Sequence, residues 1–366
     1  MRLLLVTGML MASACASAGE WHQSVSLPTS LEYDSNLPLS ATNKKGVSRL
    51  IVVPTYDLVG TFGVDEFKAG LGLNIERSSD QITSMNREDP KFLLGWRRLT
   101  ETGEFGLITR YEEASTRASE LLETGLVVND STRKTKSLAG NWRTAISELS
   151  TLTTDAEYKA VAYDAGTLTN FNNLSAGITW GYAWSERIEP FVRFAVSHYD
   201  PEKKTATVVA SDNYTVTGGV KLKTSEQMEW TVQGGSNTVS AGATNTSWQG
   251  SFAMQYLADR YDVAFNMGRS VSASGEGGFV ESDLIKGTLG YVINERSRAG
   301  VGATWQDNKG AIPNTMQLLD ASVSHELSPF WSARLYYQHK LRSQNGQPDA
   351  SGDLLGLTFV YSHPDF

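Results

Sequence analysis

Residues 174–184 read LSAGITWGYAW, and this stretch decides the fold class. Its even positions are leucine, alanine, isoleucine, tryptophan, tyrosine and tryptophan, whereas its odd positions are serine, glycine, threonine, glycine and alanine. Successive side chains of a β-strand point to opposite faces, so the alternation predicts a strand with one apolar face. The same period of two recurs at 261–268 and 331–342, while helical periodicity is almost absent. The chain is therefore expected to be all-β.

Short turns and longer polar segments alternate between these strands. The short turns lie at residues 60–63, 100–103, 147–148, 185–187, 225–227, 258–260, 294–296 and 327–329. The longer polar segments lie at 78–90, 115–131, 164–172, 200–212, 236–245, 270–281, 307–314 and 342–351. Short turns on one side and longer loops on the other are typical of a transmembrane β-barrel, with periplasmic turns and extracellular loops.

This alternation of short turns and longer loops predicts an antiparallel up-and-down barrel of about eighteen strands, or sixteen if two of them merge. The expected strands are 23–34, 47–59, 65–77, 91–100, 104–114, 132–145, 151–163, 173–184, 190–199, 213–223, 228–236, 246–257, 261–269, 282–293, 298–306, 316–327, 331–341 and 353–363. Strands of about ten residues match a tilted crossing of an outer membrane. With an even number of strands, both termini are expected in the periplasm.

Tryptophan and tyrosine side chains favour a membrane over water as the surroundings of this barrel. Trp142, Trp180 and Trp331 fall on the apolar face or near strand ends, where interfacial aromatic girdles lie. A soluble propeller or solenoid would show a tighter repeat. Only a closed barrel or a helix satisfies every backbone group in lipid. We therefore expect an integral protein of a Gram-negative outer membrane, with membrane lipid as its first partner.

Both ends of the chain carry targeting signals. Arg2, the apolar residues 3–11 and the small residues Ala16 and Ala18 have the pattern of a signal peptide cleaved after residue 18. The expected organisation is a signal peptide at 1–18 and one barrel at 19–366. Alternating apolar residues lead to a terminal Phe366, which resembles the C-terminal signal that the barrel-assembly machinery binds. Pro364 is expected just past the last paired residue, because proline cannot donate to a ladder.

Composition and motifs exclude several classes of function. The one cysteine of the chain lies in the signal segment, so a disulfide scaffold or a cysteine-ligated zinc protein is excluded. A net charge of −8 argues against a nucleic-acid partner. No HExxH, GxSxG, P-loop or EF-hand spacing occurs, and His198, His325 and His339 fall on the apolar face. We expect no enzyme, no metal site and no cofactor.

The face opposite the apolar one carries charges of both signs. The candidate pore-lining residues are Arg97, Arg110, Arg143, Asp155, Glu157, Lys159, Tyr163, Arg193, Asp262, Lys286, Arg334, Tyr336 and Lys340. Such charges need water or partners, so the lumen is expected to be wet or crossed by ion pairs. Eighteen strands enclose more space than side chains fill, unless loops fold inward. The alternative for each residue is an ionic network that supports a closed barrel.

Residues 30–39 read SLEYDSNLPL, in which a strand ends at a Tyr-Asp-Ser-Asn element formed by Tyr33, Asp34, Ser35 and Asn36. With a signal peptide before it and a barrel after it, this element resembles the porin-like outer-membrane barrels associated with exopolysaccharide biosynthesis and export. The resemblance implies a channel or accessory barrel for a secreted polysaccharide and a separate periplasmic export component. Aromatic stacking usually holds sugars, which makes Tyr163 and Tyr336 candidate contacts.

Two other functions fit the same barrel. The basic lumenal residues favour a general or anion-tolerant diffusion porin for small polar solutes. A non-conducting surface scaffold, whose loops carry the function, is the remaining alternative.

Overall fold

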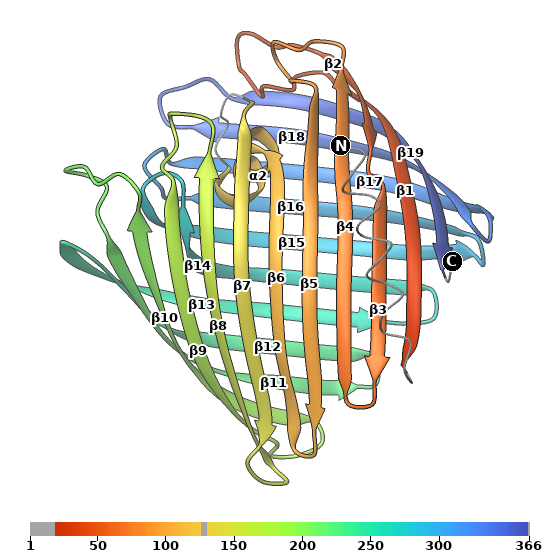
Figure 1. The fold of residues 1–366 in the computed structure, drawn as a ribbon. Coiled ribbons are helices and arrows are strands. Elements are labelled where there is room, and N and C mark those ends of the chain that lie inside the picture. The colour runs from red at the N-terminus through yellow and green to blue at the C-terminus, as the bar shows by residue number, and fades with distance from the viewer. Residues whose placement is uncertain (1–18, 126–129, 365–366) are drawn as a thin grey trace.

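One sheet closes on itself in the computed structural model, which describes residues 19–125 and 130–364 (Figure 1). Apart from β2 and β3, each strand pairs antiparallel with the next in the chain, and β1 (Glu20–Asp34) pairs with β19 (Ala350–Pro364) to complete the ring. The expected all-β, up-and-down barrel is confirmed. The elements between them are β2 (Val47–Val52), β3 (Thr55–Phe62), β4 (Asp65–Ser78), β5 (Arg87–Thr100), β6 (Gly103–Ser115), α2 (Thr116–Thr124), β7 (Thr132–Ala145), β8 (Ser150–Tyr163), β9 (Phe171–Tyr182), β10 (Ile188–Pro201), β11 (Ser211–Ser225), β12 (Met228–Ala241), β13 (Ala243–Leu257), β14 (Tyr261–Ser274), β15 (Gly278–Asn294), β16 (Ser297–Asn308), β17 (Asn314–Ser328) and β18 (Trp331–Gln344).

The strands β2 and β3 occupy a single position in the ring. Both pair with β1 and with β4, and the register continues unchanged from Val52 opposite Thr29 to Thr55 opposite Ser26. Pro54 has no N–H to donate, so the ladder is interrupted there without a shift. The sequence predicted one strand at 47–59, and the nineteen strands therefore fill the eighteen expected positions.

Three local expectations were wrong. The segment 236–245 was expected to be a loop, but β12 and β13 meet at Gly242, whose φ of +79° forms a tight turn. Likewise β14 and β15 extend into the segment 270–281. Serine, threonine and valine in these segments continue the ladders, as the bond of 3.1 Å between the Thr238 and Thr246 hydroxyls illustrates. Pro364 also pairs, opposite Ser24, since only its donor is missing.

The outer surface of the barrel is apolar. Leu31, Leu174, Leu319 and Leu335 point outward with more than half of their surface exposed. Most tryptophans lie towards the periplasmic ends of the strands, for example Trp180 near the end of β9 at 46 % exposure. Such a surface is stable in hydrocarbon and not in water. Helix α2 is far shorter than a membrane span, and no described helix is long and apolar enough to be one.

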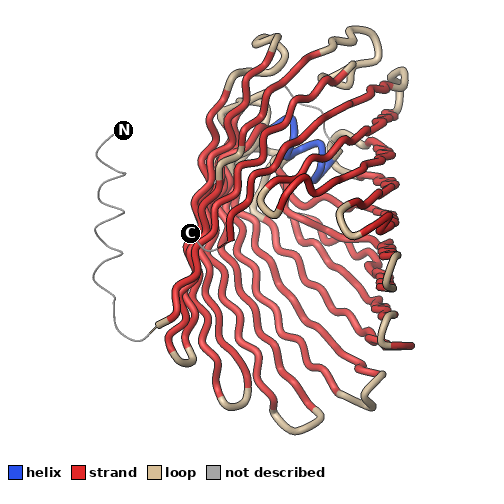
Figure 2. The backbone as a smooth tube through the Cα atoms, turned by 90° about the vertical axis from the view of Figure 1, so that its right-hand side faces the viewer, coloured by secondary structure: helices blue, strands red, loops and turns tan. Residues whose placement is uncertain are grey.

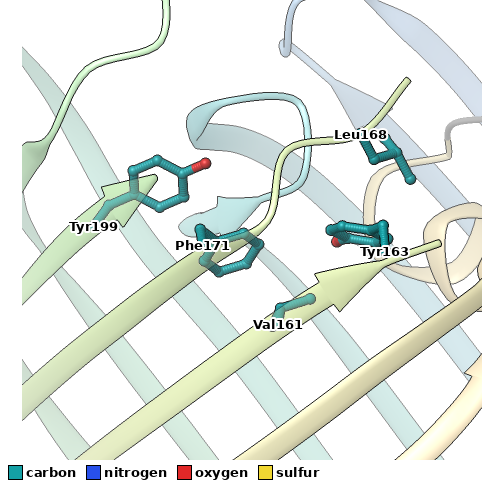
Figure 3. Packing of buried hydrophobic residues seen from close by; sticks show 5 residues of the cluster. All are labelled: Val161, Tyr163, Leu168, Phe171 and Tyr199. Atoms are coloured by element: carbon teal, nitrogen blue, oxygen red, sulfur yellow. The ribbon is translucent and has the colours of Figure 1, made fainter. Parts of the chain in front are cut away.

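Most of the buried apolar residues form two small clusters inside the extracellular half of the barrel. One consists of Val161, Tyr163, Leu168, Phe171 and Tyr199, at the ends of β8, β9 and β10 (Figure 3). The other consists of Leu39, Met316 and Ala350, with Leu121 of α2 packed against it. The described part of the chain is therefore packed most densely where loops fold into the barrel.

Candidate functional site

Helix α2 lies inside the barrel and not on its rim (Figures 1 and 2). It follows β6 directly and ends at Gly125, whose φ of +64° lets its N–H donate to the Leu121 carbonyl. In the last turn of α2, the Thr124 carbonyl accepts a hydrogen bond of 3.2 Å from Asn314 Nδ2, and the Glu123 carbonyl accepts one of 3.1 Å from Gln306 Nε2. These two partners belong to β17 and β16.

The contacts of α2 join walls on opposite sides of the ring. The eight strands β8 to β15 separate β7 from β16 on one side of the ring. On the other side, β17 is separated from β6 by β18, by β19, by β1, by the position that β2 and β3 share, by β4 and by β5. The segment from β6 to the contacts on β16 and β17 therefore crosses the bore and narrows it.

A buried ionic network holds the near end of α2. Arg117 Nη2 lies 3.6 Å from Glu76 Oε1 and donates to Ser84 Oγ at 3.2 Å. Arg49 extends the network, at 3.4 Å from Glu76 and 2.5 Å from Glu32. Burial, followed by the neighbouring Arg49, lowers the pKa of Arg117, and the surrounding carboxylates oppose this shift. Such a network holds the helix in place only when all of its members are present.

Glu120 anchors the middle of α2. Only 1 % of it is exposed, and its carboxylate accepts a bond of 3.0 Å from the Tyr163 hydroxyl. Arg133 Nη1 lies 3.5 Å from Glu120 and 2.8 Å from Glu123. Burial raises the pKa of Glu120, although Arg133 and the Tyr163 hydroxyl lower it. The carboxylate is therefore buried with two compensating partners.

The tip of the β14–β15 hairpin, residues 273–279, is the second element that folds inward. The Gly275 carbonyl accepts a bond of 2.8 Å from the Thr169 N–H, and the Ser274 carbonyl one of 3.3 Å from the Tyr199 hydroxyl. A Cβ on Gly275 would lie 2.7 Å from the Tyr163 side chain. Tyr163 thus contacts α2 through its hydroxyl and the hairpin through its ring. We call α2 and this hairpin tip together the constriction.

Below the constriction, charged side chains line the bore. Arg193 donates two bonds to Asp155, of 2.7 and 2.9 Å, and Arg97 lies 2.8 Å from Glu66. Asp262 is paired with Arg298. These ion pairs are exposed to the water of the bore, and each adds little to the stability of the barrel on its own.

Other lumenal charges have no ionic partner within residues 19–125 and 130–364. Among the candidate pore-lining residues they are Arg110, Arg143, Glu157, Lys159, Lys286 and Arg334, and of these Arg110, Arg143, Lys286 and Arg334 are exposed. An unpaired charge in this position requires water around it. The lower bore is therefore wet, and its free charges are mainly positive.

Three of the candidate residues lie at or near the constriction. Tyr163 is part of it. Lys340 is 5 % exposed and donates to the Asp34 carboxylate, while Tyr336 donates to Glu32. The Arg334 guanidinium lies 5.7 Å from the Tyr336 ring centre. That any of the candidate residues lines a conducting path stays a prediction.

The Tyr-Asp-Ser-Asn element ties the first extracellular loop to the last strand. Tyr33 points outward and is 52 % exposed. The Ser35 N–H donates to the Asp353 carbonyl at 2.8 Å, and Asn36 Nδ2 donates to the Ser351 carbonyl at 2.8 Å. Asp34 forms the pair with Lys340. Ala16, Ala18 and Phe366 lie outside the described residues.

Sequence reasoning missed the anchors of α2. Arg49, Glu76, Arg117 and Glu120 were not among the candidates, and residues 115–131 were expected to be a loop. A signal was present, because a leucine pair at 121–122 among charged residues, followed by Gly125, is a short helix with its C-terminal stop. No pattern in the sequence indicated that residues 115–131 fold into the barrel.

Comparison with known proteins identifies solved structures that have the same fold as this chain. No family model and no curated protein matches the chain. Solved structures do: OccAB4 of Acinetobacter baumannii has a TM-score of 0.54 at 8 % identity, over 94 % of this chain and 98 % of that one. The outer membrane protein OpdK of Pseudomonas aeruginosa has a TM-score of 0.55 at 10 % identity, over 94 % and 99 %. OpdK has also been solved with vanillate, at a TM-score of 0.55, 9 % identity and the same coverage of both chains.

These similarities agree with the geometry. The sheet is closed, its outer face is apolar, and its inner face is polar and wet. At such low identity the solved structures show the fold alone. The chain is an integral β-barrel of the outer membrane.

Proposed function

We propose that this barrel is a channel through which small polar solutes diffuse across the outer membrane, with a preference for anions and without catalysis. The observation that carries the proposal is the set of exposed, unpaired cations Arg110, Arg143 and Lys286 in a wet bore below the constriction. Fixed positive charge in a narrow bore raises the local concentration of anions. The similarity to OpdK, which holds vanillate in one structure, supports it.

The constriction favours small solutes over polymers. The contacts of α2 with both walls of the barrel narrow the path that a polysaccharide chain would have to take. The Tyr33 to Asn36 element supports the export of a polysaccharide, but Asp34, Ser35 and Asn36 are all bound within the chain. The hydroxyls of Tyr163 and Tyr336 are engaged by carboxylates. Polysaccharide export therefore remains a second candidate that rests on the element alone.

Planar-bilayer recording of the purified barrel tests the proposal. We expect stable conductance and a reversal potential that shows anion preference in a salt gradient. Changing Arg110, Arg143 and Lys286 together to glutamine should shift that potential towards cation preference, because three of the free positive charges of the bore are lost. Arg187→Gln, on an exposed periplasmic turn, is the control and should leave the potential unchanged.

A barrel that never conducts would contradict the proposal and favour the scaffold alternative. Deletion of the gene separates the remaining candidate. Loss of surface polysaccharide with unchanged uptake of small anions would favour export over diffusion.

A further inference from the structure

A pocket of about 230 Å³ lies on the lumenal wall formed by β3 to β6. Its inward-facing lining includes Thr55, Asp57, Gly70, Gly72, Lys91 and Arg110. On β4, Glu76 lies two inward positions beyond Gly72 towards the extracellular side, and it belongs to the anchor of α2. The pocket is therefore a recess in the bore directly below the constriction, where a solute that has passed α2 would arrive.

The recess exists because two inward positions of β4 are glycine. The register places Asp57, Gly70, Leu93 and Arg110 directly abreast on four neighbouring strands. A Cβ on Gly70 would lie 3.0 Å from Asp57 Oδ1, so the carboxylate leans over the glycine. Neighbouring strands are about 4.8 Å apart, which sets the backbones of the first and last of these residues about 14 Å apart.

The two ends of this row carry opposite charges that do not meet. The side chains of Asp57 and Arg110 form no ion pair or hydrogen bond with other described residues, and Arg110 is exposed. The pair above them is different, since Lys91 and Glu112 lie 2.7 Å apart and neutralise each other. Lys159 stands two strands beyond Arg110 in the same row and adds to the positive end. An anionic end and a cationic end therefore face one recess.

We propose that this recess binds a zwitterionic solute, with its ammonium group on Asp57, its carboxylate on Arg110 and an aliphatic body over Gly70 and Gly72. A solute with both charges satisfies both ends at once, whereas a solute with one charge leaves the opposite end unpaired. The inference rests on the proposed function, because a binding recess serves transport only in a channel, and it adds the class of solute.

Calorimetric binding to the detergent-solubilised full barrel is the test, with 6-aminohexanoate as the zwitterion and hexanoate and hexylamine as its singly charged analogues. Asp57→Asn and Arg110→Gln each remove one charge and keep the shape. Asp320→Asn and Lys223→Gln remove inward charges elsewhere in the bore and serve as matched controls.

We expect 6-aminohexanoate to bind more tightly than either analogue. Each site variant should weaken its binding about fivefold, as for the loss of one partly exposed charge contact. Hexanoate should respond to Arg110→Gln alone and hexylamine to Asp57→Asn alone. Equal binding of the three solutes, or an equal loss in the control variants, would overturn the inference.

Bilayer recordings of the same preparations separate this inference from the proposed function. Charge-dependent binding without conductance would refute the channel and leave the recess as a binding site. Conductance without binding of 6-aminohexanoate would refute the recess and leave the channel.

Discussion

The pair formed by Asp34 and Lys340 shows what a single residue contributes to this barrel. Asp34 is fully buried, Lys340 is 5 % exposed, and the two join the start of the first loop to β18. Burying both charges costs desolvation energy that their attraction roughly offsets. Removing one partner is different, because it leaves the other charge buried and alone.

Lys340→Met should therefore destabilise the barrel by about 3–5 kcal/mol, the cost of a stranded buried charge. Adding Asp34→Asn to it should recover most of this loss. Urea unfolding, followed by tryptophan fluorescence, measures both effects. Lys223→Gln, at an exposed lumenal position, is the control. A single variant as stable as the unchanged protein would contradict the interpretation of this pair.

At the residue scale, the sequence predicted inward faces but not partners. The period of two placed Arg193, Asp155 and Lys340 on the polar face correctly, since register alone fixes the face. It could not identify Asp155, on β8, as the partner of Arg193 on β10, or Asp34, 306 positions away on β1, as the partner of Lys340 on β18. Each pair crosses one intervening strand of the closed sheet, and the periodicity of a single strand carries no information about its side-chain partners on other strands.

Helix α2 is the element on which the diameter of the bore depends. It is nine residues long, and its contacts reach β4, β8, β16 and β17. A helix this short is not stable alone in water. Its position therefore rests on the buried network around Glu76 and on the bond from Tyr163 to Glu120.

Replacing residues 117–124 by a short glycine-serine linker should raise single-channel conductance several-fold, because the segment no longer crosses the bore. The same recording on a variant with residues 203–207 replaced is the control, since that exposed loop lies outside the constriction. Unchanged conductance in the first variant would show that the narrowest point lies elsewhere. An equal rise in the control would show that any shortened loop has this effect.

At the element scale, strands were predictable and their interruptions were not. Every expected strand is present, because each carries its own alternation. The break at Pro54 and the extension of β14 and β15 beyond the expected ends depend on pairing with neighbours. The helix was missed because its nine residues fall within a polar segment that reads as an ordinary loop.

The whole molecule is ordered by one rule, apolar residues outward and polar residues inward. Phe194 points outward at 54 % exposure, while Ala195 is its inward neighbour on β10. The closed sheet leaves no free edge, so the bilayer contacts side chains only. This rule was fully readable from the sequence, and it fixed the fold class without any relative.

Phe194→Lys should therefore destabilise the folded barrel by about 2–4 kcal/mol, the cost of a lysine in the lipid-facing band. Ala195→Lys places the same charge in the wet bore and should cost much less. Equilibrium unfolding in lipid vesicles compares the two variants. Equal losses would mean that the two faces of β10 do not differ in their surroundings.

The far contacts of α2 also set an order of events during assembly. Glu123 and Thr124 meet partners that follow them by 183 and 190 residues, on strands near the end of the chain. These partners reach their places only when the sheet has curled round far enough to bring β16 and β17 opposite β6. The anchors of α2 on β4 and β8 are therefore available early, whereas its contacts on the far wall form only in a barrel that is nearly complete.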